Sequence, residues 1–196
     1  MNDERLSQQI QFLVEVDKLK QVLRQNVVTG SRRQENDAEH SWHLALMAPI
    51  LAEYAAEKVD VLRVMQMVLI HDLVEIDAGD TFAYDKQGYE DKDEREQKAA
   101  NRIFNILPSD QAREIMNLWR EFEEMQTPEA RFAAVLDRLQ PLLLNYHTEG
   151  HTWKKPGVTS KDVYKRNEVA KESTPLLGEY IKEIIEDSIK KGILKE

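Results

Sequence analysis

The sequence predicts an all-α fold, on three observations. Apolar residues recur at the three- and four-residue spacing of amphipathic helices along nearly the whole chain. No segment shows the alternation of a half-buried strand, and there is no internal repeat. Two stretches that contain proline, 107–110 and 126–129, have the pattern of helix starts. The 196 residues fit a single domain over 1–196, with a core over about 10–150 and C-terminal helices over about 160–192.

The first third of the chain predicts two helices joined by a loop. An amphipathic helix begins near residue 10 and ends near Arg24, and a loop marked by Gly30 follows it. Asn36 and Glu39 have the spacing of a capping box, so the second helix is expected to start at 36 or 37. Pro49 is expected to kink this helix.

A third helix, over about 60–77, is apolar on most of its sides. A helix of this kind is normally central in its domain, and Gly79 is expected to end it. The polar stretch 81–94 is expected to form a loop. Further helices are predicted over 91–106, 109–125, 128–149 and 160–192, the last of them broken around Pro175 and Gly178.

Composition and charge narrow the classes of function. The chain is 41% hydrophobic and 32% charged, as ordinary globular proteins are. Its net charge of −9 argues against nucleic acid as a partner bound through a basic surface. The absence of cysteine excludes disulfides and thiolate metal sites. The first residues lack the apolar core of a signal peptide and no apolar run approaches the roughly 20 residues of a membrane span, so we expect a soluble cytoplasmic protein with no membrane contact.

Polar residues on apolar helix faces identify the candidate site. His71 and Asp72 lie late in the most apolar predicted helix, and Glu75 follows one turn later. Such buried charges are costly unless they are paired or bind a metal. His40 heads the apolar stripe of the second helix, and Asp137 lies in the apolar run FAAVLDRLQPLLL. Two imidazoles and two carboxylates that converge on one point would make a mixed site for Mn²⁺, Co²⁺, Fe²⁺, Zn²⁺ or Mg²⁺.

This donor set indicates hydrolytic chemistry. A divalent ion there would offset the buried charge and make a bound water more acidic. Glu75, one turn from His71, could take a proton from that water or donate one to a leaving group. Taken alone, His71 and Asp72 could instead be a buried hydrogen-bonded pair, and Glu75 could be the partner in a structural ion pair.

The order His40, His71-Asp72, Asp137 resembles the H…HD…D signature of the HD-domain metal-dependent phosphohydrolases. The resemblance covers most of the chain and implies a helical bundle whose central buried helix carries the His-Asp pair. The stretches RQENDAEHS, HDLVEIDAGD and LWREFEE…EARFAAVLDRL look like those of the 5′-deoxynucleotidase branch. Members of that branch release phosphate from deoxynucleoside 5′-monophosphates, usually as homodimers. The resemblance therefore implies a small-molecule nucleotide substrate and a homodimer.

The resemblance also implies roles for single residues. Glu75 matches the catalytic acid or base of the branch, and Asp80 matches a second acidic residue near the scissile phosphate. Arg24 stands where the branch has a phosphate-binding arginine, and Arg33 matches an arginine that touches substrate or supports the site. Gln25 stands where a well-known bacterial member has a tryptophan against the sugar, which leaves the choice between ribose and deoxyribose open. The metal ligands that the resemblance implies are His40, His71, Asp72 and Asp137.

We expect one divalent metal ion rather than two. Two-metal enzymes with this signature need additional histidines between the His-Asp pair and the last aspartate, and the chain has none from 72 to 137. The same gap argues against the di-iron oxygenases that share the scaffold. The main hypothesis is phosphate release from (deoxy)nucleoside 5′-monophosphates. The alternatives are another HD phosphohydrolase (for triphosphates, pyrophosphates or a cyclic nucleotide), an Fe²⁺ redox enzyme, and a non-catalytic metal-binding helical module.

Other histidines and acids near the motifs are expected to lie outside the chemistry. Asp77 is interpreted as a helix-end or solvent residue, and His43 as a residue of packing or of the polar helix face. His147 and His151 fall in a predicted loop, where they could instead border a substrate pocket with Trp153.

Overall fold

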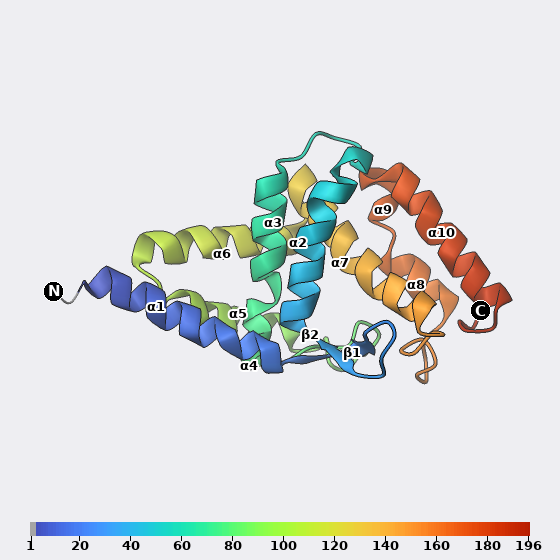
Figure 1. The fold of residues 1–196 in the computed structure, drawn as a ribbon, viewed down its shortest axis with the longest axis horizontal. Helices are drawn as coiled ribbons and strands as arrows, with labels where there is room; N and C mark the ends of the chain where they lie inside the picture. The colour runs from blue at the N-terminus through green and yellow to red at the C-terminus, as the bar shows by residue number, and fades with distance from the viewer. Residues whose placement is uncertain (1–2) are drawn as a thin grey trace.

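The computed structural model describes residues 3–196, and apart from one small hairpin its regular elements are helices (Figure 1). The hairpin, β1 (Leu23–Val27) and β2 (Gln34–Asn36), lies between the first two α-helices. The predicted all-α class is confirmed. The helices are α1 (Glu4–Val16), α2 (Asp37–Leu51), α3 (Val61–Ile70), α4 (Glu75–Ala78), α5 (Lys92–Phe104), α6 (Ser109–Glu124), α7 (Pro128–His147), α8 (Ser160–Arg166), α9 (Ala170–Ser173) and α10 (Pro175–Lys190).

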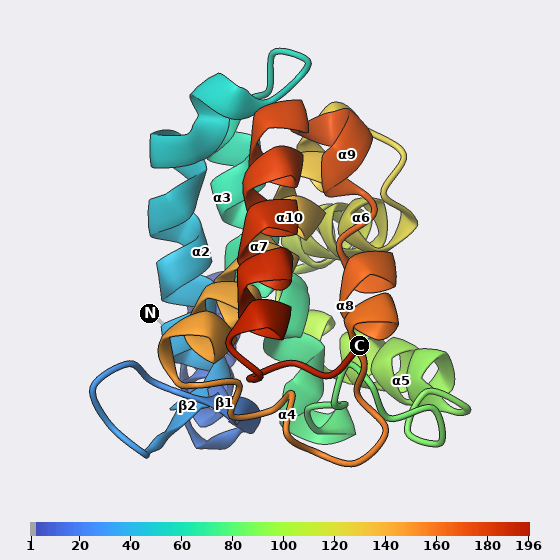
Figure 2. The same ribbon diagram turned by 90° about the vertical axis from the view of Figure 1, so that its right-hand side faces the viewer.

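Helices α2, α3 and α7 form the centre of the molecule, as expected for the most apolar predicted helix. They pack on one another, with α1, α5 and α6 projecting on one side and α9 and α10 lying on the other (Figure 1). Figure 2 shows α10 running along the outside of this centre, with the hairpin at the lower end of α2. Among residues 3–196, no helix combines the length and the apolar character needed to cross a bilayer.

Two clusters of buried apolar side chains meet at the end of α3. Met67 of α3 belongs to a large cluster that includes residues of α2, α7 and α10. Leu73 and Val74, just after α3, belong to a second cluster with residues of α5 and α6. His71 and Asp72 lie where the chain passes from one cluster to the other, so apolar packing on both sides fixes the backbone that carries them.

The third predicted helix is not one continuous α-helix. Helix α3 ends at Ile70, residues 71–74 form a tighter 3₁₀ turn, and α4 covers the next four residues. A 3₁₀ turn has three residues per turn, so Asp72 and Glu75 lie on the same side of the chain. Gly79 ends α4 with a φ of 76°, in the left-handed region that favours glycine, and the predicted end is confirmed.

The first predicted helix is placed too late in the chain, because α1 begins at Glu4 and not near residue 10, and the expected end at Arg24 lies in a strand. Helix α1 ends at Val16, a 3₁₀ turn covers 17–21, and β1 then pairs antiparallel with β2. In β1 an apolar residue faces solvent and polar residues face the interior: Leu23 is 50% exposed, whereas Arg24 and Asn26 are buried. A strand whose buried face is polar does not show the alternation of apolar residues from which strands are predicted.

Other predicted boundaries lie close to the observed ones. The capping box is present, with reciprocal hydrogen bonds between Asn36 and Glu39 at the start of α2. The chain breaks before Pro175 as predicted, and it breaks once more between α8 and α9. Gly178, however, does not interrupt α10. A Cβ atom there would lie 3.1 Å from the carbonyl oxygen of Ala170, so glycine allows α9 and α10 to pack closely.

Candidate active site

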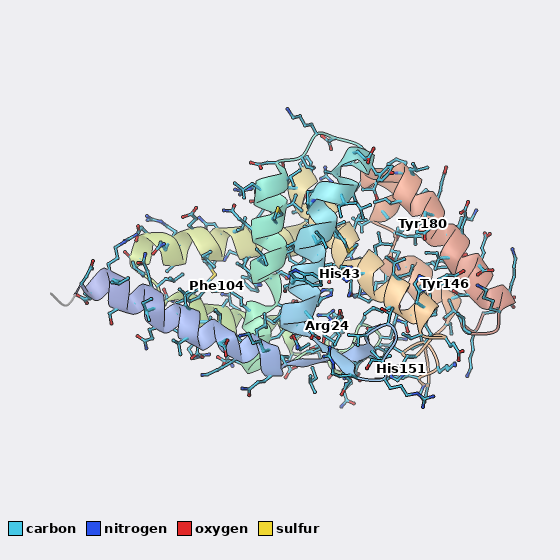
Figure 3. The ribbon with its side chains drawn as sticks, viewed as in Figure 1. Arg24, His43, Phe104, Tyr146, His151 and Tyr180 are labelled. Atoms are coloured by element: carbon cyan, nitrogen blue, oxygen red, sulfur yellow. The ribbon has the colours of Figure 1, made fainter. Side chains whose placement is uncertain are left out.

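The structure brings the predicted site residues together from distant parts of the chain. His40 lies in the first turn of α2, His71 and Asp72 in the turn after α3, and Asp137 in the middle of α7. Arg24 of β1 reaches the same group, and Figure 3 shows it by the lower end of α2. Both histidines, Arg24 and Asp72 are buried, and the Asp137 side chain is 17% exposed. All of these residues except His40 line a cavity of about 200 Å³.

Hydrogen bonds fix the orientation of both imidazoles. His40 Nδ1 lies 3.0 Å from Oε1 of Gln140, and His71 Nδ1 lies 2.9 Å from the carbonyl oxygen of Val68. Both partners are acceptors, so each Nδ1 is assigned a proton.

Burial lowers the pKa of His40 to about 4, so its Nε2 carries a lone pair. Burial alone would lower the pKa of His71 as well, but the charges of Asp72 and Asp137 outweigh it and raise this pKa to about 9, so His71 Nε2 carries a proton that a metal ion would displace. His40 Nε2 lies 3.1 Å from Asp137 Oδ1. His71 Nε2 is buried and lies 3.0 Å from Asp72 Oδ1, although no residue among 3–196 makes a well-aligned hydrogen bond to it.

These donor atoms fit a divalent metal ion. His40, His71 and Asp72 each offer one ligand atom, and the three atoms lie within 4.8 Å of one another. Asp137 Oδ1 lies 3.7 Å from His71 Nε2 and extends the set to two nitrogens and two carboxylates. Imidazole lone pairs facing carboxylate oxygens repel unless a proton or a cation lies between them. This mixed set suits several first-row divalent ions.

Arg24 is bound within the protein by two carboxylates. Its Nη1 donates to Asp72 Oδ2 at 2.9 Å and to Asp37 Oδ1 at 3.1 Å. Its Nε lies 3.8 Å from Oε2 of Glu35, another buried acid. Burial alone would lower the pKa of Arg24, but the surrounding carboxylates raise it well above the ordinary value. Arg24 therefore stays charged and holds Asp72 in position.

Glu75 is a buried carboxyl group that retains a proton. Burial, together with the charges of Asp72 and Asp37, raises the pKa of Glu75 well above its ordinary value. Asp37, which faces Glu75, has its pKa raised to about 7 by burial and by the charge of Asp72. A proton shared by Asp37 and Glu75 reduces their mutual repulsion, and we assign it to Glu75 at neutral pH.

Asp80 lies at a junction of three depressions in the surface. It lines the cavity that holds the metal donors, a smaller cavity of about 50 Å³ beside Trp153, and an open depression of about 560 Å³ beside Phe82. Thr81 lines all three as well. Burial raises the pKa of Asp80, although the charge of Arg24 opposes the shift. Asp80 therefore favours its protonated form more than an exposed aspartate does.

The structure does not bring Arg33 to the site. Its side chain is 56% exposed and forms an ion pair with Glu39 at 2.9 Å, away from the cavity wall. Asp77 lies outside the cavity too and pairs with Arg102 of α5 through a hydrogen bond of 2.8 Å. That ion pair joins α4 to α5 and agrees with the structural interpretation of Asp77.

The remaining histidines also lie away from the metal donors. His147 and His151 are exposed, and neither lines the cavities described above. His43 is partly buried, with Nδ1 3.3 Å from Nε2 of Gln140. Trp153, in contrast, is 1% exposed and lines the smaller cavity. This agrees with the alternative interpretation that Trp153 borders a substrate pocket.

Sequence analysis missed several residues of the site. Asp37 is completely buried. Acidic residues are common in the first turn of a helix because they interact favourably with the helix dipole, so the sequence did not distinguish Asp37 from an ordinary helix-start residue. Gln140 follows Asp137 by three residues in an apolar run, and this spacing could have identified it. Arg138 and Arg166 line the cavity as well, and no sequence pattern distinguishes Arg166 from an exposed arginine.

Two buried imidazoles and two carboxylates at the centre of a helical bundle define a helical metal-binding domain. The sequence profile of the HD domain matches residues 16–177. The chain belongs to the HD domain family. The resemblance that the motifs indicated is thereby confirmed.

Individual relatives agree with this assignment. The human protein 5′-deoxynucleotidase HDDC2 is 32% identical over 135 residues, covering 68% of this chain and 65% of that protein. The Danio rerio protein of the same name is 32% identical over 149 residues, covering 76% and 72%. The chain thus spans slightly less than two thirds of the human relative.

Solved structures share the fold over nearly the whole chain. The structure of a predicted metal-dependent phosphohydrolase from Magnetospirillum magnetotacticum MS-1 is 53% identical, with a TM-score of 0.94 over 98% of this chain and 96% of that one. An HD-domain phosphohydrolase from Listeria innocua is similar in fold alone, with a TM-score of 0.68 at 19% identity over 94% and 91% of the two chains.

Metal content tests the donor set. We expect the metal-stripped protein to rebind about one equivalent of Mn²⁺, and His71→Ala and Asp72→Ala to abolish this binding because each removes a ligand atom. Elemental analysis after dialysis measures the ratio. His151→Ala, which removes an exposed histidine, is the control and should bind as the wild type does. Full occupancy in His71→Ala would contradict the assignment.

Proposed function

We propose that the protein is a metal-dependent phosphomonoesterase that releases phosphate from deoxynucleoside 5′-monophosphates. The observation that carries the proposal is that one cavity contains both metal donors and carboxyl groups able to transfer protons. Three of the four metal donors, His71, Asp72 and Asp137, lie on its wall. Glu75 and Asp80, whose pKa values are raised, line it beside them. The names of the 5′-deoxynucleotidase and phosphohydrolase relatives support the same reaction class and substrate class.

The metal ion would be held by His40, His71, Asp72 and Asp137. When bound, it supplies Lewis-acid stabilisation of the phosphoryl group and activates the attacking water. The protein holds these side chains in place through Gln140 and Val68, which bind the two imidazoles, and through Arg24, which binds Asp72.

Two protons must move during hydrolysis of a phosphate monoester. The attacking water loses one, and the 5′-oxygen of the departing nucleoside gains one. Glu75, which holds the proton that it shares with Asp37, would donate the second to the departing 5′-oxygen. Asp80, at the junction of the three depressions, would in its ionised form accept the first, because a raised pKa makes an ionised carboxylate a stronger base.

The three depressions also suggest how a nucleotide would lie. The phosphate would occupy the cavity with the metal donors, where Arg24 lines the wall. The nucleoside would extend past Asp80 and Thr81 toward Phe82 and Tyr84, which line both other depressions. Gln25 lies along this path and accepts a hydrogen bond from Lys155, so these two residues are placed to contact the sugar or the base.

We also propose a homodimer, which the resemblance implies and an apolar surface supports. Trp42, Leu46 and Ile50 form a stripe on α2 with exposed fractions of 63%, 48% and 59%. Leu62 and Leu69 of the adjacent α3 are exposed as well. Contiguous apolar surface on a protein of this size commonly marks an interface.

Light scattering tests the dimer. The wild type should have the mass of two chains, and Leu46→Glu should have the mass of one, because a charge in the stripe would lose its water on association. Tyr180→Glu, on the exposed face of α10, is the control and should leave the mass unchanged (Figure 3). A wild-type protein with the mass of one chain would contradict the proposal.

A phosphate-release screen tests the function. Metal-stripped protein, restored separately with Mn²⁺, Co²⁺, Mg²⁺ or Zn²⁺, should release phosphate from dAMP and act more weakly on dATP, cyclic AMP and an aryl phosphate. Glu75→Gln should lower kcat by about 10²- to 10⁴-fold with the metal still bound, because it removes a proton-transfer group.

Asp77→Asn is the matched control for Glu75→Gln. It neutralises another carboxylate of α4, one that pairs with Arg102 outside the cavity, and should leave kcat unchanged. Release from no monophosphate with any metal would refute the proposed function. Full activity in Glu75→Gln would refute the assigned role of Glu75, and a preference for dATP would favour a triphosphate hydrolase.

A further inference from the structure

Two arginines on the cavity wall, Arg138 and Arg166, have no carboxylate at hydrogen-bond distance among the described residues. Within residues 3–196, Arg138 donates only to the thioether sulfur of Met125, at 3.3 Å. Oδ2 of Asp137 lies 3.7 Å from Nη2 of Arg166, and no described residue accepts a hydrogen bond from Arg166. The Arg166 side chain is only 25% exposed. Both guanidinium groups therefore have donor capacity that neither the protein nor full exposure to water satisfies.

Both arginines lie on the wall that two cavities share. One is the cavity with the metal donors, and the other is the smaller cavity beside Trp153. They come from different elements, since Arg138 follows the metal donor Asp137 in α7 and Arg166 is the last residue of α8. Two elements thus place positive charge at the point where the phosphate and nucleoside parts of a nucleotide would meet.

The positive charge of Arg24 is already compensated by carboxylates of the site. The carboxylates of Asp37 and Asp72 lie 3.1 and 2.9 Å from its Nη1. A phosphate dianion in this acidic cavity needs cations beyond Arg24. Both carboxylates accept from the same Nη1 atom, and Nε of Arg24 has no hydrogen-bond partner among residues 3–196, so the limit on Arg24 is its single charge and not its number of donors. Further guanidinium groups can bind phosphate through paired hydrogen bonds.

We propose that Arg138 and Arg166 bind the phosphate of the substrate as a clamp across the two cavities, with Arg24 acting mainly on Asp72. The proposal rests on the proposed function and adds two phosphate-binding residues to it. Arg166 would reach the phosphate from α8 while Arg138 reaches it from α7. The alternative role for Arg166 is to orient Asp137, its neighbour at 3.7 Å.

Binding of inorganic phosphate to the Mn²⁺-loaded protein tests the clamp without turnover. Isothermal titration should show that Arg166→Gln weakens phosphate binding by about 10-fold or more, the usual loss for a hydrogen bond between charged groups. The same variant should raise the KM for dAMP more than it lowers kcat, and it should keep one equivalent of metal. Arg138→Gln should behave in the same way.

Two further variants separate the clamp from other effects. Lys165→Gln removes the same charge from the neighbouring, exposed position of α8 and should bind phosphate as the wild type does. Arg166→Lys keeps the charge but not the paired donors, so it should bind more weakly than the wild type and more tightly than Arg166→Gln. If Arg166→Gln unfolds, the loss in Arg166→Lys alone decides the question.

Several results would overturn the clamp. These are unchanged phosphate affinity in Arg166→Gln, loss of metal from that variant, an equal loss in Lys165→Gln, and a wild type that does not bind phosphate. Failure of the proposed function is distinguishable from these results. A wild type that binds phosphate through Arg166 but releases none from any monophosphate would refute the phosphomonoesterase and leave the clamp standing.

Discussion

The buried guanidinium of Arg24 is the electrostatic constraint on which the centre of this protein depends. It holds Asp37 at the start of α2 and Asp72 in the turn after α3, and so joins the hairpin to two central helices. Removing one partner of a buried ion pair costs roughly 3–5 kcal/mol, because the remaining charge is left without compensation. Arg24 reaches this position only because β1 turns its polar face inward.

The single positive charge of Arg24 does not balance all the carboxylates of the site. The remaining negative charge explains the metal donors, the protonated Glu75 and the two further arginines. Asp137 faces the Nε2 atoms of two imidazoles, an arrangement that a divalent ion would stabilise. Glu75 retains a proton, which lowers the charge further and leaves it ready for proton transfer. In our proposal, Arg138 and Arg166, which donate no hydrogen bond to a carboxylate among residues 3–196, bind the phosphate of the substrate. The same surplus of negative charge thus underlies both the metal site and the chemistry.

Much of this organisation was predictable from the sequence, and the exceptions share a physical cause. The capping box at Asn36 and the end at Gly79 depend on local chemistry, which the sequence displays directly. The convergence of the metal donors was predicted from polar residues in apolar helical runs together with the resemblance to the HD-domain family. The strand that carries Arg24 was missed because its buried face is polar. The close approach of α9 and α10 at Gly178 and the 3₁₀ turn after α3 depend on packing between different elements. Arg166 reaches the cavity because of where α8 packs in the folded chain. Such features have no signal in a single sequence.

The most direct test of this account is the position of the bound ion. Anomalous diffraction from crystals of the Mn²⁺-loaded protein locates the metal without reference to activity. The account predicts one strong peak between the Nε2 atoms of His40 and His71 and the carboxylates of Asp72 and Asp137. A main peak among Asp37, Asp72 and Glu75, which form the other possible donor group in residues 3–196, would contradict it. So would the absence of any peak at the centre of the bundle.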